Sequence, residues 1–221
     1  MGSEMCIRDR IESDLSKIEK ILKSENLILK AVRPVPVNKD ILGTIASSCL
    51  PNIYQLYIQS TDKVFYEEKF ETNLYQARKL IEEIYLDDEQ LYFCSLSSKT
   101  IIYKGLMLPD AIQDFYLDLK SSKFESSICV FHQRFSTNTH PRWHLAQPFR
   151  LLAHNGEINA IRGNRNWVKA RSSKFKSPRL PKIQEFKQLV NETGSDSSAL
   201  DNMIEILLNG GVKLFRAIRM V

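Results

Sequence analysis

One stretch of this sequence, residues 132–171, limits most strongly what the chain can fold into. It contains seven Arg or Lys residues, all four histidines and several asparagines, but a single acidic residue, Glu157. Burying so many hydrogen-bonding groups for packing alone is unfavourable, because each polar group that leaves water without a partner costs free energy. We therefore interpret this stretch as a functional site and the rest of the chain as its support.

The positive charge of the protein is concentrated in the same stretch. The whole chain has a net charge of +5, while residues 132–171 alone carry +6, so the remaining residues sum to −1. A long polyanion usually needs a wider basic face than this. The distribution therefore favours a small anionic ligand over nucleic acid.

Length and composition predict one soluble domain. The 221 residues, 43% of them hydrophobic, are enough for one core. The sequence has no apolar run near the roughly 20 residues of a membrane span, and no apolar core of a secretory signal, so we expect a cytoplasmic protein without membrane contact.

The four cysteines lack the C-x-x-C spacing of a zinc ribbon and do not resemble a disulfide framework; we expect Cys94 and Cys129 to be small core residues.

The first ten residues have the period of neither a helix nor a strand, and we expect them to be a non-native lead-in without a part in the fold, which leaves one partial domain over residues 11–221. Apolar spacing and capping residues predict helices at 11–29 (ending near Asn26), 38–48, 72–86, 109–119, 158–171, 182–190 and 199–208. Alternating or apolar runs predict strands at 52–59, 127–132 and 149–154, a hairpin of 91–96 with 100–104, and a strand or turn at 65–70. The strands at 127–132 and 149–154 both lead into polar segments, which places the chemistry at strand ends.

Asn155 and Gly156 are candidates for stabilising a developing negative charge. A side-chain amide and a backbone N–H in one loop can point the same way, and glycine lets a substrate carbonyl approach closely. The alternative is a tight Asn-Gly turn without chemistry. The neighbouring arginine-rich sequence favours the oxyanion hole.

Arg134 and Asp196 are candidates for holding opposite charges of a ligand. Arg134 follows the apolar run at 127–132 and can bind a carboxylate through two parallel N–H bonds; a surface salt bridge is its alternative. Asp196 follows Gly194-Ser195 and can pair with an ammonium group, or simply cap the next helix.

The histidines and aromatic residues raise two other possibilities. His140 and His144 have i, i+4 spacing, but Pro141 lies between them and no carboxylate completes a ligand set, so we expect no metal site. Trp143, Phe149 and Trp167 are more often core or pocket wall than base-stacking surfaces. A basic nucleic-acid-binding module, using Arg150, Arg162, Arg165 and the tryptophans, remains the alternative function.

Four segments together carry a family resemblance: HQRFSTNTHPRWHLAQPFRLLAHNGEINAIRGNRNW, GSDSSALDN, VRPVPVNKDILG and YFCSLSSKTIIYKGLMLP. In these the chain resembles the glutaminase domain of the large subunit of glutamate synthase, a class II, N-terminal-nucleophile glutamine amidotransferase. The resemblance covers residues 11–221. Other class II amidotransferases share only the Arg, the QPF, the HNG and the SD of the motif, so membership of another branch is the weaker alternative.

The resemblance implies an αββα sandwich, incomplete at its N-terminus, that hydrolyses L-glutamine to glutamate and ammonia. By motif position, Arg134 and Asp196 would hold the α-carboxylate and α-ammonium groups, Asn155 and Gly156 would form the oxyanion hole, and Thr137 would line the pocket. In the family, the ammonia passes to 2-oxoglutarate in other domains of the same polypeptide, which carry FMN and an iron–sulfur cluster. Those cofactors are not expected in this chain. A small electron-donating subunit or ferredoxin is the further partner that the family implies.

The cysteines depart from the family pattern. The family nucleophile is a cysteine at the start of the mature chain, whose own α-amine, with a pKa near ~8, acts as the base. Cys6 is followed by Ile-Arg-Asp-Arg rather than by glycines, and the other three cysteines are internal. We therefore expect a fragment without its nucleophile, inactive alone.

Overall fold

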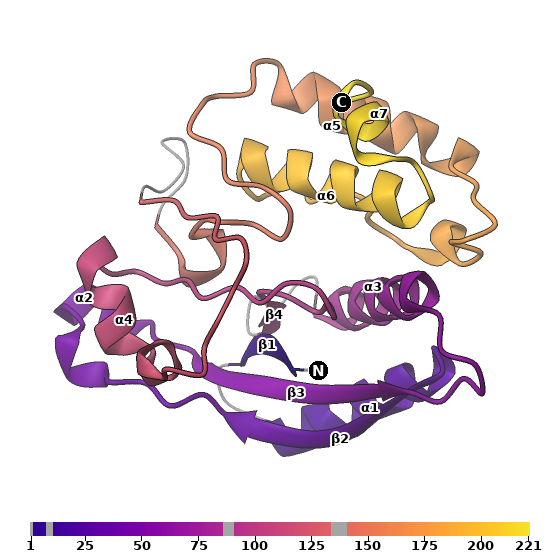
Figure 1. The fold of residues 1–221 in the computed structure, drawn as a ribbon. Helices are drawn as coiled ribbons and strands as arrows, with labels where there is room; N and C mark the ends of the chain where they lie inside the picture. Colours follow the sequence, from indigo (N-terminus) through magenta and orange to yellow (C-terminus); the bar gives the residue numbers. More distant parts are fainter. Residues whose placement is uncertain (1, 8–10, 86–90, 134–140) are drawn as a thin grey trace.

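The computed structural model describes residues 2–7, 11–85, 91–133 and 141–221, and of residues 2–7 and 11–13 only the backbone. These residues form a mixed α and β structure (Figure 1). The strands are β1 (Gly2–Ile7), β2 (Leu27–Pro34), β3 (Asn52–Ser60) and β4 (Leu91–Phe93). The α-helices are α1 (Ile11–Ser24), α2 (Thr44–Ser48), α3 (Glu67–Ile84), α4 (Ile112–Phe115), α5 (Ile161–Arg171), α6 (Asp196–Asn209) and α7 (Leu214–Ile218).

The four strands form one antiparallel sheet in the order β2-β3-β1-β4. Gly2 lies opposite Tyr57 of β3, and Met5 lies opposite Phe93 of β4, so β1 is an inner strand. Together with α1 and α3 the strands give a split βαβ arrangement, in which each helix connects two strands that are not neighbours. All four described strands of this sheet thus lie within residues 2–93.

The main core lies between the sheet and the helices α1 and α3. Leu22 of α1, Leu56 of β3, and Ala77 and Ile81 of α3 are at most 1% exposed. Inward residues recur at three- and four-residue steps in both helices, which is the spacing that puts them on one face. Asn26, with φ 57°, lies just past α1 and turns the chain into β2.

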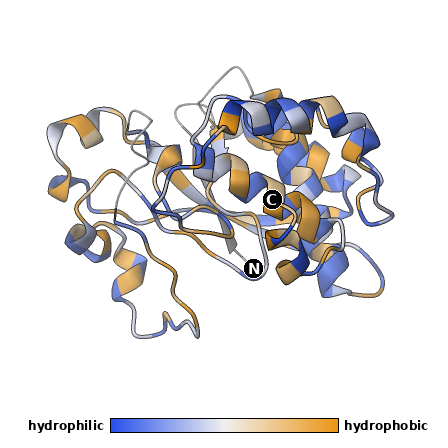
Figure 2. Cartoon of the chain, turned by 90° about the horizontal axis from the view of Figure 1, so that it is seen from above, coloured by the Kyte–Doolittle hydropathy of each residue, from blue (hydrophilic) through white to orange (hydrophobic). Residues whose placement is uncertain are grey.

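The C-terminal half covers α3 on the side away from the sheet. Figure 1 shows α6 next to α3, with α5 and α7 farther out. Tyr75 of α3 packs with Leu180 and Phe186 in a second buried cluster, which also includes Ala199 of α6. Hydrophilic and hydrophobic residues alternate along these helices in Figure 2, as expected of amphipathic helices. α6 is thus positioned by both halves of the molecule.

A third cluster closes the end of the sheet near α2 and α4. Phe115, Tyr116 and Trp143 are buried there, and the ring centroids of Phe115 and Trp143 are 5.7 Å apart. The indole N–H of Trp143 donates to the carbonyl of Ala46 at 3.4 Å. The prediction that Trp143 and Phe149 are core residues is confirmed, whereas Trp167 is exposed.

Several predicted helices are confirmed with shifted ends. Residues 72–84 of the helix predicted at 72–86 belong to α3, whose last residue is Ile84. Because α3 begins at Glu67, the strand or turn predicted at 65–70 is wrong. The helix predicted at 199–208 is α6, which begins at Asp196, and that predicted at 158–171 is α5. Residues 38–48 and 109–119 form short helical pieces, and 182–190 contains only the 3-10 turn Ile183–Glu185. The strand predicted at 52–59 is β3.

Four predictions about strands and one core prediction are wrong. Residues 2–7, which we expected to take no part in the fold, form β1. Residues 91–93 pair with β1 instead of forming a hairpin with 100–104. Residues 127–132 and 149–154 are not strands, and Cys129 is exposed, whereas Cys94 is buried as predicted. No helix among the described residues is long and apolar enough to cross a bilayer.

Candidate functional site

The loop that carries Asn155 and Gly156 is held by the side chain of Gln147. The Gln147 amide nitrogen donates to the carbonyl of His154, and the His154 N–H donates to the Gln147 amide oxygen, both at 2.8 Å. The peptide bond between Gln147 and Pro148 is cis. Because Gln147 is buried and bonds both backbone groups of His154, it fixes the residue just before the candidate oxyanion hole.

The same loop lies against the N-terminus of α6. The Ile158 N–H donates to Asp196 Oδ2 at 2.7 Å, and His154 Nδ1 lies 3.2 Å from Ser197 Oγ. The structure therefore brings the segment with Asn155 and Gly156 together with Asp196. Asp196 is 8% exposed and also accepts from the N–H of Ser197.

Asp196 is not the helix cap, which was the alternative role predicted for it. Ser195 caps α6, since its hydroxyl accepts from the Ser198 N–H at 3.1 Å. Asp196 is instead the first helical residue, where a negative charge interacts favourably with the helix dipole. Ser195 thus occupies the N-cap position, and the buried Asp196 carboxylate, which accepts from the N–H groups of Ile158 and Ser197, is a candidate binding group.

Gly156 packs closely against the ring of His154. A Cβ at this position would lie 3.0 Å from Cε1 and 3.2 Å from Nε2 of His154. Any larger residue would push the imidazole, which faces Ser197. Both Asn155 and Gly156 are exposed, so their donors are accessible to a ligand. Arg134 and Thr137, the other predicted site residues, lie outside the described residues.

Two of the three arginines assigned to the nucleic-acid alternative have internal roles. Arg165 donates to the carbonyls of Gly194 and Ser195, at 2.6 and 3.2 Å, and so holds the segment that leads into α6. The Arg150 side chain, 9% exposed, pairs with Glu82 of α3, and Arg162 is exposed. Because Trp143 is also buried, these residues do not form a shared basic and aromatic surface. The arrangement favours the small-ligand interpretation.

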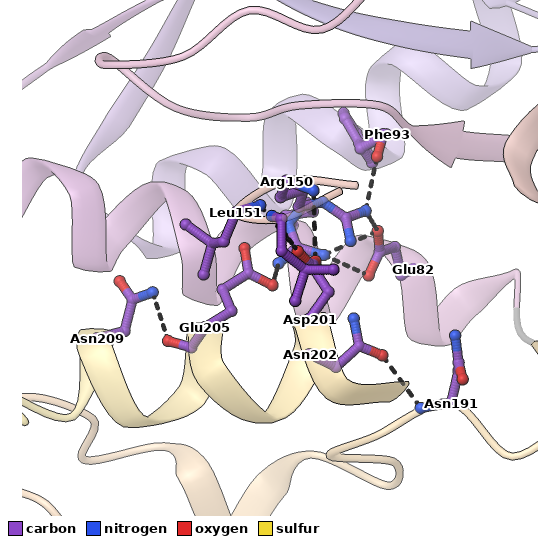
Figure 3. A network of polar contacts seen from close by, with 11 residues as sticks. Glu82, Phe93, Arg150, Leu151, Asn191, Asp201, Asn202, Glu205 and Asn209 are labelled. Carbon is purple, nitrogen blue, oxygen red and sulfur yellow. Dashed lines mark hydrogen bonds and ion pairs between the residues drawn. The ribbon is translucent and has the colours of Figure 1, made fainter. Parts of the chain in front are cut away.

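A buried ionic network joins α3 to α6 below the loop (Figure 3). Arg78, 1% exposed, pairs with Glu82 at 2.9 Å and with Glu205 at 2.5 Å. The Arg150 guanidinium donates to Glu82 at 2.8 Å and to the Phe93 carbonyl at 2.6 Å. Burial by itself would raise the pKa of Glu82, but the charges of Arg78 and Arg150 outweigh it and keep this pKa below its ordinary value.

Asp201 of α6 completes this network with its carboxylate. One oxygen accepts from the N–H groups of Leu151 and Leu152, at 2.8 and 3.2 Å, and the other accepts from that of Arg150 at 3.3 Å. Burial and the nearby charge of Glu205 raise the pKa of Asp201 to about 6, against the opposing effects of Arg150 and these N–H groups.

This raised pKa predicts a specific dependence of stability on pH. The folded protein binds a proton at Asp201 between about pH 4 and pH 6, whereas the unfolded chain does not. The contribution of Asp201 to the free energy of unfolding therefore falls as pH rises through this window, by about 3 kcal/mol in total. Asp201→Asn removes the titration. We expect the difference in unfolding free energy, wild type minus Asp201→Asn, to fall from pH 4 to pH 7 in urea titrations. A difference that stays constant would contradict the raised pKa.

Sequence reasoning did not predict the contacts of Gln147, His154 and Asp201 that hold the loop. A signal for Asp201 was present, because an acidic residue at position 201 shares a helix face with the apolar residue Ile204, and such a residue needs a buried partner. No local pattern distinguishes Gln147 from a surface glutamine, since its partner is a backbone seven residues away.

The comparison with protein families decides the membership of the chain. The family described as class II glutamine amidotransferases matches residues 5–221. This chain belongs to the class II glutamine amidotransferases. The resemblance to class II glutamine amidotransferases that the sequence motifs indicated is thereby confirmed over nearly the whole length of the chain. Membership of this family implies the fold of N-terminal-nucleophile hydrolases.

Similar proteins with curated names include several glutamate synthases. The chain is 40% identical to ferredoxin-dependent glutamate synthase of Cyanidium caldarium over 211 residues, 93% of this chain and 14% of that protein. It is 42% identical to the glutamate synthase [NADPH] large chain of Azospirillum brasilense over 182 residues, 81% of this chain and 12% of that one. It is 39% identical to the glutamate synthase [NADPH] large chain of Bacillus subtilis over 218 residues, which are 96% of this chain and 14% of that protein. The chain thus spans about a seventh or less of the length of each of these relatives.

Proposed function

We propose that this chain is the glutamine-binding part of the glutaminase domain of a glutamate synthase. Asn155 and Gly156 donate to the oxyanion that forms at the side-chain carbonyl of L-glutamine. Arg134 binds the α-carboxylate, Asp196 binds the α-ammonium group, and Thr137 lines the pocket. Ammonia released there serves the amination of 2-oxoglutarate to glutamate in other domains of the same polypeptide.

The contact between the loop and α6 carries this proposal. Ile158 and Asp196 join the candidate oxyanion hole to the candidate ammonium site through one hydrogen bond of 2.7 Å. A carboxylate offers about four acceptor positions, and three donors from Ile158 and Ser197 contact Asp196 among the described residues. This leaves capacity for an ammonium group beside the loop.

The reaction would need little movement of the loop. When a thiolate adds to the amide carbon of glutamine, negative charge collects on its oxygen, and two preplaced donors stabilise that charge more in the transition state than in the ground state. The amide nitrogen then leaves as ammonia, and water releases glutamate from the thioester. Gln147 fixes the residue before these donors, so they are positioned before glutamine binds.

The complete domain is proposed to be an αββα sandwich, and membership of the class II amidotransferase family supports this proposal. We keep a cytoplasmic location as a prediction.

FMN and the iron–sulfur cluster belong, on this proposal, to other domains. Among the described residues, no three His, Cys, Asp or Glu side chains gather closely enough to hold a metal ion, and we assign these residues no step with either cofactor. The electron donor is proposed to be a small subunit or ferredoxin, in line with the name of the Cyanidium relative.

The chain by itself is expected to bind glutamine without cleaving it. The α-nitrogen of Cys6 is part of a peptide bond within β1, and Cys49, Cys94 and Cys129 are internal, so none carries the free amine that activates the family nucleophile. We expect ammonia release from L-glutamine to equal that of a no-protein control in a coupled assay. Release above this control that disappears in Asn155→Ala would contradict the prediction.

The function is tested by calorimetric titration with L-glutamine at two salt concentrations. A single site with affinity nearly independent of salt is expected, because a zwitterion displaces few counterions. Binding of single-stranded DNA that weakens steeply between about 50 and 200 mM salt, without glutamine binding, would instead support the nucleic-acid alternative.

A further inference from the structure

The stretch between Gln147 and His154 is held from two sides at once. Its backbone is anchored to α6, because the Asp201 carboxylate accepts the N–H groups of three consecutive residues, Arg150 to Leu152. Asp201 is 1% exposed, so water does not compete for these bonds. The other side is anchored by the Arg150 side chain, which reaches Glu82 of α3 and the backbone of β4. Figure 3 shows these contacts converging between the two helices.

These anchors lie close along the chain to the candidate oxyanion hole. Only Ala153 separates Leu152 from His154, and the Phe149 N–H donates to the Leu152 carbonyl at 2.9 Å, which closes a tight turn. Gln147 then bonds both backbone groups of His154. Few rotatable bonds are therefore left between the Asp201 carboxylate and Asn155.

We infer that Asp201 is a positioning residue for the glutamine site: its carboxylate fixes the 150–152 backbone and thereby the orientation of the Asn155 and Gly156 donors. This inference rests on the proposed function. Asp201 touches no substrate and acts through the loop. Because α6 carries both Asp196 and Asp201, one rigid helix fixes the distance between the ammonium site and the oxyanion hole.

Asp201→Asn tests this role, because the amide keeps the shape of the side chain but replaces one acceptor oxygen with a donor. Amide hydrogen exchange is measured without ligand by NMR, and L-glutamine affinity by calorimetry. We expect faster exchange at Leu151, Leu152 and His154, and an affinity loss on the order of tenfold.

Glu205→Gln is the matched control. Glu205 lies one turn along α6 and pairs with Arg78, but it does not bond the 150–152 backbone. This variant is expected to lower the melting temperature while leaving His154 exchange and glutamine affinity at wild-type values. Equal losses of affinity in both variants would overturn the inference, because general destabilisation would then explain them.

The remaining outcomes separate the inference from the proposed function. If His154 stays as protected in Asp201→Asn as in wild type, or if affinity is unchanged, Asp201 does not position the loop. If the wild-type protein binds no glutamine, but hydrogen exchange at His154 is faster in Asp201→Asn and not in Glu205→Gln, the proposed function is wrong. The positioning of the loop by Asp201 is then still supported. Should Asp201→Asn not fold, Asp201→Glu replaces it, because the longer side chain keeps the charge but moves the carboxylate relative to the 150–152 backbone; wild-type affinity and wild-type His154 exchange in that variant would contradict the inference.

Discussion

Replacing Arg78 by methionine is expected to destabilise the protein by about 3–5 kcal/mol, more than any other single substitution in the ionic network between α3 and α6. Methionine fills much of the volume, so the cost is electrostatic rather than a cavity. Without Arg78, the Glu205 carboxylate, 12% exposed, loses the ion pair that the structure shows for it, and Glu82 loses one of its ion pairs while it keeps the pair with Arg150. Urea unfolding followed by circular dichroism measures the loss.

Two further variants make the result specific. Arg78→Met combined with Glu205→Gln should be less destabilised than the sum of the single changes, because the uncompensated carboxylate is gone. Lys99→Met breaks an exposed pair with Glu67 and should change stability by less than about 1 kcal/mol. If Arg78→Met unfolds at the wild-type urea midpoint, the network does not hold α3 to α6.

Asp196→Asn is expected to weaken L-glutamine binding by at least about 30-fold while leaving the fold intact. The change removes the charge that pairs with the α-ammonium group, a loss of about 2 kcal/mol or more for a buried pair. The amide oxygen of asparagine still accepts from the Ile158 N–H, so the loop keeps its contact with α6. Calorimetry gives the affinity, and thermal unfolding checks the fold.

A ligand that lacks the α-amino group sharpens this test. Wild type should prefer L-glutamine over 4-carbamoylbutanoate by a similar factor, and the preference should nearly vanish in Asp196→Asn, because the lost charge pair is the same. Asp110→Asn, at an exposed aspartate, serves as the control and should keep the wild-type preference. An undiminished preference in Asp196→Asn would show that another group binds the ammonium.

The regular spacing of apolar residues predicted those helices and strands that bury one continuous face. The strand β3 and the helices α3 and α6 carry enough inward-facing residues at regular spacing to be recognised without tertiary information. Their first residues were less accurate, since α3 begins at Glu67 without a side-chain cap to mark its start. Apolar spacing thus predicted that these helices and strands exist, but it did not predict the residues at which they begin.

The failures have a common physical cause in non-local pairing. Residues 2–7 lack alternation yet become an inner strand, because β3 and β4 offer edges on both sides. Residues 127–132 have the composition of a strand, but composition cannot supply the neighbour that a strand needs for its hydrogen bonds. Strand formation depends on a partner that one segment does not encode.

The roles predicted for the site residues stay predictions, whereas the contacts that hold the loop were not predicted at all. Asn155, Gly156 and Asp196 were identified from residue type and neighbourhood, and the structure brings their two segments together. Gln147 and Asp201 act through backbone groups of the loop, and backbone groups leave no trace in a sequence pattern. Only the inward position of Asp201 on α6 signalled a buried partner.

The central claim is that one free amino acid binds between the Asn155–Gly156 loop and the N-terminus of α6. Titration of isotope-labelled protein with L-glutamine, followed through amide chemical shifts, tests it most directly. The largest shifts are expected at Asn155, Gly156 and Ser197. Shifts confined to the groove of about 280 Å³ between α5 and α6, lined by Trp167 and Met203, would contradict the claim.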